Sequence, residues 1–498
     1  MNILRRPMFW SAFVCSISAV LSLFVIPLSY VVICVSIIIL ISFAILYKKY
    51  QYIVVALAIV LFATSLITEF TKIDRLKQIN GEKVTGCFLV TDEPIVQDSF
   101  NIVTLKEVEC NYIPSNVKLL LFDYNKTNLK MGDVVNATLK LSIVTKSSKY
   151  RISNYSDGVY ATANAVKLKK TGECNLFYKT AGRIRIFVKD KVSSLFKGDV
   201  AGLLVALTIG DKTLLSDNFA LNIKTTGISH VVVVSGMHLA IIMTAIFAFL
   251  DRLFYNKYIR CLISIISVIL ICAVCGFTMS IIRAGVMFIV AGLASIFSRE
   301  NDSLSSLLTA VTLVLISMPF AIFNLSFQLS VLSTLAIIWV VPFYSKLIKE
   351  RFNVRFKILK VLIDTFLCSV FAIIFTLPVI IKTFGFVSIV APITNLVISY
   401  PVMFALIFNI AALLISLIPI IKLLSTAVFF VAGVCSRFMV FAVNEIAKLP
   451  ITVAVLPKNA FWWSIVVIAI VVGFMYIYEF KRKRIDFFAN CIRRGFKT

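Results

Sequence analysis

Histidine and charge are scarce in this chain of 498 residues: it has two histidines, and charged residues make up 15% of it. Acidic residues are the scarcer sign, with 24 Asp and Glu against 50 Lys and Arg. Two histidines are too few for a histidine-rich metal centre. Hydrophobic residues make up 60% of the chain, and several uncharged runs exceed the roughly 20 residues that span a bilayer. The composition therefore predicts a polytopic α-helical membrane protein.

The first 69 residues predict about three transmembrane helices. Residues 7–47 carry no charge and, as one straight helix, would be roughly twice the hydrocarbon thickness, so we expect two spans that turn near Pro27. A third apolar run, 50–68, ends at Glu69. The first helix lacks a small-residue cleavage site, so we interpret it as retained. Basic residues at 5, 6, 48 and 49 place the N-terminus in the cytoplasm and the residues after 70 outside.

The composition of residues 70–175 is that of a small extracytoplasmic domain. Stretches of alternating polarity, such as GCFLVTD and DVVNATLKLSIV, are separated by Asn, Gly, Pro and Ser clusters, which predicts antiparallel strands. A five-stranded β-barrel of the OB type suits this spacing. Four aromatic residues of this domain either pack in its core or stack on unpaired bases: Phe88, Phe122, Tyr124 and Tyr160.

Basic residues are in excess in this exported part of the chain. Residues 72–198 hold 21 Lys and Arg against 12 Asp and Glu, a net charge of +9. The positive-inside rule does not govern long exported domains. A polyanionic partner is therefore one explanation of the excess, and a generally basic proteome is the other.

Amphipathic helices are predicted for residues 176–224, because basic and apolar side chains are mixed in 176–198, as in a helix that lies on a membrane face or lines a channel mouth. Residues 225–480 then return to the membrane. The candidate spans are 226–250, 260–282, 284–298, 304–322, 325–345, 361–381, 386–416, 423–447 and 461–480. Six basic residues and one acidic residue in 346–360, and the basic tail 481–498, place the C-terminus in the cytoplasm.

Proline and cysteine modify this picture locally. Pro392, Pro401 and Pro419 lie in one uncharged stretch, 383–421, which indicates two short spans or a broken, re-entrant helix. The C-x-x-C of the apolar run 260–282 has no second pair to complete a zinc site, and helix packing explains it better. The odd number of cysteines in the exported domain leaves open which of them pair: Cys87, Cys110 and Cys174.

Both histidines lie in one uncharged stretch, GISHVVVVSGMHLAII, and polar groups in apolar surroundings indicate function. On a continuous helix His230 and His238 would be about 12 Å apart, so they cannot share a metal ion unless Ser235 and Gly236 break the helix. Ser235 and His238 can form a dyad at i and i+3, which makes an intramembrane hydrolase one hypothesis. A helix-helix contact and an aqueous conduit are the other interpretations.

Further polar residues in apolar surroundings favour a conduit. Arg283 interrupts two apolar runs and should face the interior or an interface, Gln328 needs a partner in a dry bundle, and Asp211 and Lys212 suggest a neutralised pair at a membrane boundary. A passage for an anion uses Arg or Lys and avoids acidic rings, which suits the sparse acids of this region. A transporter of a small anionic solute is therefore an alternative function.

The residues 201–242, AGLLVALTIGDKTLLSDNFALNIKTTGISHVVVVSGMHLAII, carry a specific pattern. They resemble the signature of the ComEC family of competence proteins: a Leu-rich stretch ending in Gly-Asp-Lys, then Thr-Gly-x-x-His and Ser-Gly-x-His. The later SIIRAGVM and NLSFQLS resemble the next two family blocks, in order. The resemblance runs from roughly 190 to 415 and, with the β domain, covers about two-thirds of the chain.

The resemblance implies a channel in the inner membrane of a bacterium that admits single-stranded DNA into the cytoplasm during natural transformation. The implied partners are DNA and the bilayer, with a DNA receptor, a separate nuclease, a cytoplasmic ATPase and a second copy of the chain as candidates. The residues that match family motifs are our candidates for the DNA pathway: Asp211, Lys212, Gly227, His230, Ser235, Gly236, His238, Arg283 and Gln328.

Two departures from the family pattern limit what is carried over. Ser326 replaces the glycine that usually precedes Phe-Gln-Leu-Ser, which puts close backbone approach there in doubt. Many relatives continue into a metallo-β-lactamase-like nuclease, whose histidine cluster this sequence does not contain. We therefore expect no enzyme activity and no cofactor in this chain, and the absence of a G-x-x-x-x-G-K-[ST] loop assigns any ATP use to a partner.

Overall fold

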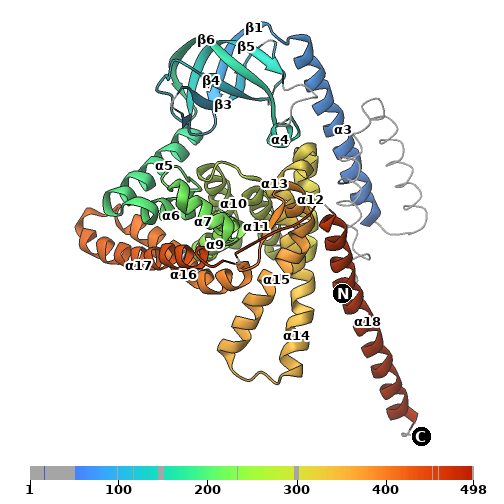
Figure 1. Ribbon diagram of the computed structural model, residues 1–498. Helices are drawn as coiled ribbons and strands as arrows, with labels where there is room; N and C mark the ends of the chain where they lie inside the picture. Colours follow the sequence, from blue (N-terminus) through green and yellow to red (C-terminus); the bar gives the residue numbers. More distant parts are fainter. Residues whose placement is uncertain are drawn as a thin grey trace. The chain divides into compact units, whose positions relative to one another are not determined.

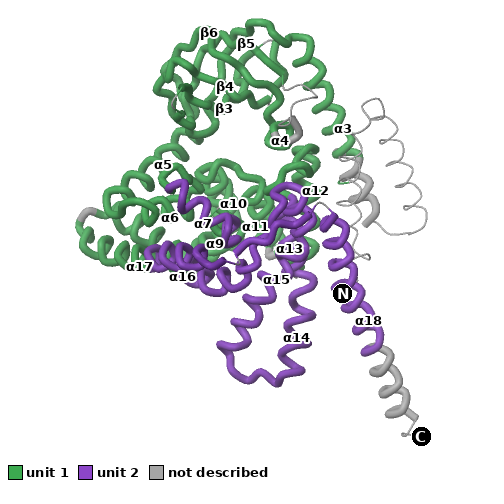
Figure 2. The backbone as a smooth tube through the Cα atoms, in the orientation of Figure 1, with its two compact units in different colours: residues 1–215, 231–327, 403–434 green, residues 216–230, 328–402, 435–498 purple. Residues whose placement is uncertain are grey.

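The computed structural model describes residue 16 and residues 51–97, 99–110, 112–115, 117–143, 151–232, 234–296, 302–450, 452–457 and 459–495. The first two predicted spans, within 7–47, lie outside the described residues. The chain forms two compact units that interleave in sequence (Figure 2). Unit 1 comprises residues 1–215, 231–327 and 403–434, and unit 2 comprises residues 216–230, 328–402 and 435–498.

Unit 1 contains a small sheet domain that follows helix α3 (Gln51–Gln78), the helix in which the third predicted span falls (Figure 1). Its strands are β1 (Lys83–Val90), β2 (Ile95–Val96), β3 (Asn101–Glu109), β4 (Lys118–Asp123), β5 (Asp133–Ile143) and β6 (Val159–Cys174). A short helix, α4 (Arg151–Ser156), precedes β6. The alternation that predicted strands is clear in β5, whose residues are buried and exposed in turn because one face covers the core.

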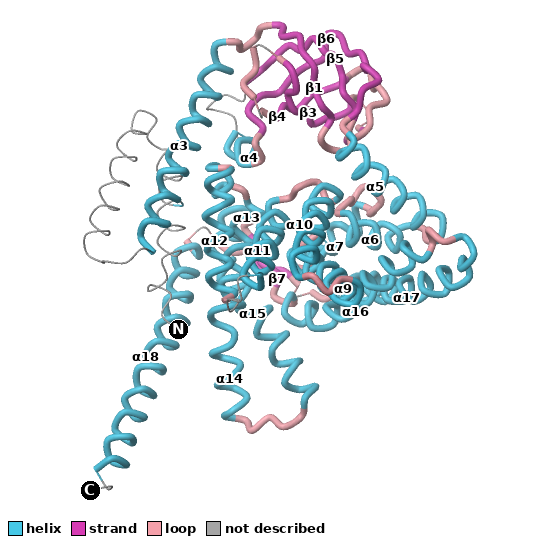
Figure 3. The backbone as a smooth tube through the Cα atoms, turned by 180° about the vertical axis from the view of Figure 1, so that it is seen from behind, coloured by secondary structure: helices cyan, strands magenta, loops and turns pink. Residues whose placement is uncertain are grey.

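The strand pairings of the sheet domain return to the strand from which they start. In order, β1 pairs with β5, β5 with β6, β6 with β4, β4 with β3, and β3 again with β1, while β2 pairs with β3 at the edge. All of these pairs are antiparallel except β4 with β6, which is parallel. Figure 3 shows β1, β3, β4, β5 and β6 together in this domain. Fully buried side chains, among them Phe88, Leu105, Leu121 and Leu139, fill its core.

The remaining helices of unit 1 begin with α5 (Leu176–Leu195), whose first turn is capped by Asn175. They continue with α6 (Gly198–Ile209), α9 (Gly236–Leu253), α10 (Lys257–Val274), α11 (Met279–Ile296), α12 (Ser303–Ser317) and the 3₁₀ turn η2 (Pro319–Phe323). Of the amphipathic helices predicted for 176–224, α5 buries one side only. The prediction is wrong for α6, where residues 201–209 are all buried, because that helix is apolar on every side.

Unit 2 contains the short helix α7 (Asp217–Thr225), and it shares α8 (Ser229–Val232) and α13 (Leu325–Leu335) with unit 1. Its other helical elements are the π-helical turn η3 (Ala336–Val340), α14 (Val341–Arg351), α15 (Lys357–Thr383) and α18 (Ala460–Gly495). Strands β7 (Phe386–Ser388) and β8 (Val453–Val455) pair with each other. Helices α16 (Ala391–Ile415) and α17 (Lys422–Ala447), separated by η4 (Pro419–Ile421), contribute to both units.

Seven described helices are long and apolar enough to cross a membrane: Ser229–Leu253, Lys257–Val274, Leu325–Arg351, Lys357–Thr383, Ala391–Ile415, Lys422–Ala447 and Ala460–Arg482. Three further apolar helices are shorter: Gly198–Ile209, Met279–Ala294 and Ser303–Ser317. The chain is therefore a multi-pass helical membrane protein. Each of the nine candidate spans after residue 225 coincides with one of these helices, and two of the nine, 284–298 and 304–322, fall on the shorter ones.

The prediction of two short spans or a broken helix in 383–421 is wrong: α16, which follows β7, runs without interruption from Ala391 to Ile415 through Pro401, and Pro392 lies in its first turn, where no intrahelical amide bond is lost. Within the span 226–250, α8 ends at Val232 and α9 begins at Gly236, so the chain has the break at Ser235 and Gly236 that the sequence left open. The separation estimated for the two histidines on one straight helix therefore does not apply.

Candidate functional site

Ser235 and His238 are in hydrogen-bond contact at the N-terminus of α9. Ser235 Oγ lies 2.9 Å from His238 Nδ1, and the backbone N–H of Ser235 donates to the same nitrogen at 3.0 Å. These contacts form a capping box, in which a side chain at the third helical position reaches back to the N-cap residue. Because Nδ1 already accepts the backbone proton, the geometry supports helix capping better than the activation of Ser235 as a nucleophile.

Arg283 and Gly236 lie side by side behind this cap. Arg283 is 5% exposed, and its Nη1 donates to Met287 Sδ at 3.2 Å. A Cβ at Gly236 would lie 3.2 Å from Arg283 Nη2 and 3.3 Å from Ala284 Cβ. The glycine thus leaves room for a guanidinium group, which a larger side chain would displace.

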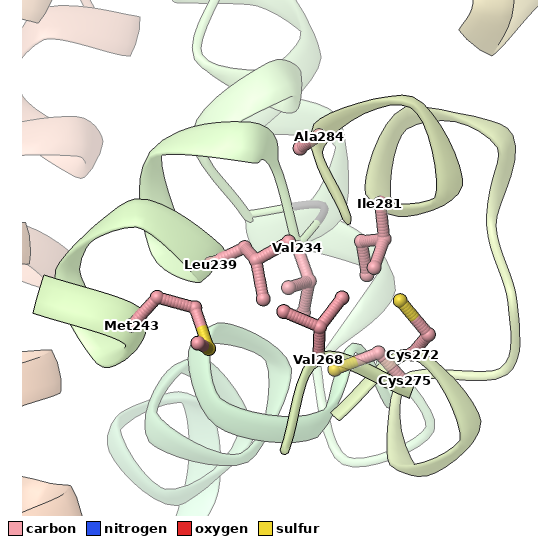
Figure 4. Close-up of a cluster of buried hydrophobic side chains, with 8 residues drawn as sticks. All are labelled: Val234, Leu239, Met243, Val268, Cys272, Cys275, Ile281 and Ala284. Atoms are coloured by element: carbon pink, nitrogen blue, oxygen red, sulfur yellow. The ribbon is translucent and has the colours of Figure 1, made fainter. Parts of the chain in front are cut away.

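A buried apolar cluster fixes the cap in place (Figure 4). Val234, the residue before the cap, packs with Leu239 and Met243 of α9 and with residues of α10 and α11. Cys272 and Cys275 belong to the same cluster, so the C-x-x-C packs helices, as the sequence favoured. Within the described residues no group of three or more His, Cys, Asp and Glu is arranged to hold a metal ion.

Asp211 lies just after α6 and is held by α5. Its carboxylate accepts from Lys189 Nζ at 3.1 Å and from the backbone N–H of Thr213 at 2.9 Å. Burial raises the pKa of this carboxyl, but the Thr213 and Lys189 hydrogen bonds outweigh burial and leave the pKa below its ordinary value. Asp211 therefore forms an ion pair with Lys189 of α5, and Lys212 is exposed.

Arg185 occupies a similar place one turn earlier on α5. Its Nη1 donates to the carbonyl oxygens of Ile209 at 3.2 Å and of Val274 at 2.6 Å, the last residues of α6 and α10. Its Nε donates to Glu93 of the sheet domain at 3.2 Å. One guanidinium thus joins the C-termini of two helices, where a cation is favourable, to the sheet domain.

A buried polar pair that sequence reasoning missed lies on α6 and α16. The amide of Asn409 donates to Thr208 Oγ1 at 2.8 Å, and Asn409 is 0% exposed. Within the described residues Asn409 Oδ1 has no hydrogen-bond partner. Its sequence signal is a polar residue in the uncharged stretch 383–421, where the prolines are the more conspicuous feature.

In unit 2, Gly227 makes a close backbone contact. It adopts φ +77°, and a Cβ there would lie 2.5 Å from Ala391 Cβ and 2.8 Å from Ser388 Cβ. A side chain at Gly227 would therefore collide with β7 and α16. His230, three residues later on α8, is exposed.

Other polar residues of unit 2 also lie on facing elements. Asn222 of α7 donates to Asn444 of α17 at 2.9 Å, and Asn395 of α16 donates to Ser369 of α15 at 2.8 Å. Gln328 is half-buried on α13. The structure therefore brings Ser235, Gly236, His238 and Arg283 together in unit 1, whereas Gly227, His230 and Gln328 belong to unit 2.

Asn324, four residues before Gln328, holds elements of unit 1 together. Asn324 caps α13 by accepting from Phe327 N at 3.1 Å, and its amide donates to Asp157 Oδ1 at 2.6 Å. Burial raises the pKa of Asp157 above its ordinary value. Nearby, Phe320 of η2 contacts Phe70 and Tyr155. These contacts attach α3 and α4 to η2, so Asn324 serves assembly within unit 1.

The four aromatic candidates of the sheet domain divide evenly. Phe88 and Tyr160 are in the core, at 0% and 5% exposure, and Tyr160 donates to Glu69. Tyr124 is 61% exposed, and Phe122 is half-buried beside it, with Phe100 in contact with both at centroid distances of 5.6 and 5.5 Å. Two of the four aromatics thus stay available at the surface. Cys87, Cys110 and Cys174 are free.

The helical part of the chain matches one family model. Residues 207–482 match the model described as Competence protein, which is more than half of the chain. The chain belongs to the Competence protein family. This confirms the resemblance to the ComEC proteins that the sequence motifs indicated, and the matched range includes all nine candidate pathway residues.

Among curated proteins, the chain is similar to ComE operon protein 3 of Bacillus subtilis (strain 168), with 25% identity over 156 residues. The aligned segment covers 31% of this chain and 20% of that relative. No solved structure matches the chain.

Proposed function

We propose that this competence protein is a channel in the inner membrane of a bacterium and that it passes single-stranded DNA into the cytoplasm during natural transformation. The observation that carries the proposal is the family match over residues 207–482. Competence is the capacity to take up DNA, and a multi-pass membrane protein is the component that such uptake requires at the lipid barrier. With both termini in the cytoplasm, the sheet domain lies outside.

The sheet domain supports the proposal through its charge and its topology. Its strand pairings return to β1, and we propose that it is a barrel of the OB type. The net charge of +9 over 72–198, to which the end of α3 and helix α5 contribute as well as the strands, attracts a polyanion. Phe122 and Tyr124 offer surface rings on which unpaired bases can stack.

The membrane part supports the proposal through buried polar groups in an acid-poor bundle. Arg283 is a buried cation beside Gly236, and Asn409 and Asn395 add amides at helix contacts. An ionisable group within a membrane is a candidate for a pathway, and the amides can also serve helix packing. We keep Asp211, Lys212, Gly227, His230, Ser235, Gly236, His238, Arg283 and Gln328 as candidates, and the contacts favour a supporting role for Asp211, Gly227, Ser235 and His238.

Other steps of uptake fall to partners in this proposal. We assign DNA delivery to a receptor, degradation of the excluded strand to a separate nuclease, and any use of ATP to a cytoplasmic ATPase. A small-anion transporter remains the alternative function, and it has little use for a basic external domain.

The test is the uptake of fluorescently labelled DNA by the host strain with and without this gene. We expect the deletion to abolish label that is protected from external nuclease, while DNA still attaches to the cell surface. Expression of the gene from a plasmid should restore protection. Undiminished internalisation in the deletion strain would reject the DNA channel and leave the anion transporter as the better hypothesis.

A further inference from the structure

Lysines from three strands of the sheet domain share one outward face. Lys83 of β1 lies opposite Lys140 of β5, and across β5 the partners Thr138 and Asn136 lie opposite Lys167 and Lys169 of β6. All four lysines are exposed, while the residues that alternate with them on β5 are buried. We call Lys83, Lys140, Lys167 and Lys169 the lysine face.

This arrangement works against the stability of the sheet. Like charges directly opposite each other in an antiparallel pair are destabilising, and Lys83 and Lys140 are such a pair. Within the described residues none of the four lysines makes an ion pair, whereas the neighbouring Lys170 pairs with Asp133 at 2.7 Å. The fold therefore neutralises the adjacent lysine and leaves these four available to an external anion.

The other groups on the face are hydrogen-bonding and not aromatic. Thr85 and Thr138 lie in contact between the lysines, with hydroxyl oxygens 3.1 Å apart, and Asn136 contacts Cys87. The acidic residues Glu82 and Glu109 border the face, next to Lys83 and opposite Cys87 respectively. Lys167 and Lys169 have Cα atoms about 7 Å apart along β6. Their ammonium groups, with hydroxyls and amides beside them, suit phosphate oxygens, and the named side chains of this face include no aromatic ring to stack on an unpaired base.

We propose that the lysine face binds the phosphate backbone of double-stranded DNA, and that it is separate from the aromatic surface of Phe122 and Tyr124. The proposal rests on the proposed function, because it names the form of DNA that the external domain meets. Duplex DNA is favoured over a single strand because its charge density is higher and its bases are already stacked. The lysine face holds the incoming duplex, and the aromatic surface serves the unpaired strand.

The experiment measures binding of a fluorescent duplex and of a single strand of equal length to the full-length protein in nanodiscs of neutral lipid, over a range of salt concentrations. The test variant is K83Q/K140Q/K167Q/K169Q. We expect its duplex affinity to fall at least tenfold and its salt slope to drop by about one per lysine that contacts phosphate. The matched control, R351Q/R355Q/K357Q/K360Q, removes four charges from the α14–α15 connection and should bind like the parent chain.

Two further variants separate binding from folding and from the aromatic surface. Arginine at all four positions, K83R/K140R/K167R/K169R, keeps the charges and should keep duplex binding. F122A/Y124A should weaken the single strand and spare the duplex. Because the glutamine variant removes like-charge repulsion, its apparent melting temperature should equal or exceed that of the parent.

Three results would overturn the proposal. The first is a glutamine variant that binds the duplex as tightly as the parent does. The second is a glutamine variant that loses affinity for the single strand more than for the duplex. The third is a glutamine variant that loses affinity for vesicles of anionic lipid but not for DNA. None of these results rejects the proposed function itself. That function is rejected if the parent protein binds no DNA and the deletion strain internalises DNA normally.

Discussion

Ser235 and His238 illustrate how a catalytic pattern can arise from helix capping. The imidazole nitrogen that a nucleophilic serine would need as its base already accepts the backbone N–H of Ser235 at 3.0 Å. The pair therefore organises the start of α9, after the break that follows α8, and places Gly236 beside Arg283.

A substitution at Ser235 separates the two interpretations. Ser235→Ala removes a hydroxyl whose capping contribution is about 1 kcal/mol, so we expect most DNA uptake to remain, measured as nuclease-protected label. His238→Gln should retain function better than His238→Ala, because a Gln carbonyl at the third helical position can accept the same backbone proton. Near-complete loss of uptake in Ser235→Ala, at normal protein abundance, would instead indicate a nucleophile.

Gly227 provides a second prediction at the residue scale. Alanine there must adopt φ +77° and place its Cβ 2.5 Å from Ala391 Cβ. We expect Gly227→Ala to lower the apparent melting temperature of the purified protein by several degrees, through roughly 1–2 kcal/mol of backbone strain and a further 1–3 kcal/mol of overpacking.

The matched control for this prediction is Gly385→Ala in the same unit. Gly385 has φ +73° with nothing within 4 Å of the added Cβ, so its variant carries the backbone strain alone. Equal melting temperatures for the two variants would show that the contact with Ala391 contributes nothing.

At the scale of elements, α5 connects the sheet domain to the helices of unit 1. It was predicted to lie on a membrane face or at a channel mouth because of its basic residues. Two of those residues are instead engaged: Arg185 with the ends of α6 and α10 and with Glu93, and Lys189 with Asp211. The basic charge of an amphipathic helix therefore need not face lipid or ligand.

We predict that Arg185→Gln weakens this connection. It leaves the carbonyl oxygens of Ile209 and Val274 without their donor and Glu93 without its cation, at a cost of roughly 2–4 kcal/mol. The measurement is the apparent melting temperature, together with protease sensitivity between the sheet domain and α6. Arg183→Gln, an exposed arginine on the same helix, is the control and should leave both unchanged. Identical behaviour of the two variants would contradict the role of Arg185.

For the whole molecule, the proposal to test is that a basic domain outside the membrane captures DNA and an acid-poor helical part passes it. We predict that replacing residues 72–170 by a short linker weakens DNA capture and flattens its dependence on salt, because counterion release accompanies phosphate binding. Capture is measured as cell-bound labelled DNA over a salt series, in cells where the truncated protein reaches normal abundance in the membrane. Capture that is unchanged by both deletion and salt would reject the electrostatic role.

Much of the helical part could be read from the sequence because span length and charge are local properties. All nine candidate spans after residue 225 coincide with helices, and the basic stretch 346–360 covers the end of α14, the turn that follows it and the start of α15. The predictions of helix continuity fail where they rest on a single feature of the sequence. Pro401 does not break α16, and a run without charges, 226–250, conceals the break at which Ser235 begins a new helix.

Local pattern alone determined that this is a multi-pass membrane protein with a strand-rich insertion and a family-specific motif between residues 201 and 242, since hydrophobic length, alternation and motif spacing are written along the chain. Only the tertiary structure decided which distant residues meet. Asp211 pairs with Lys189, Gly227 packs against Ala391, and lysines 83, 140, 167 and 169 share one face, because strand register and helix packing depend on contacts between segments that the sequence keeps apart.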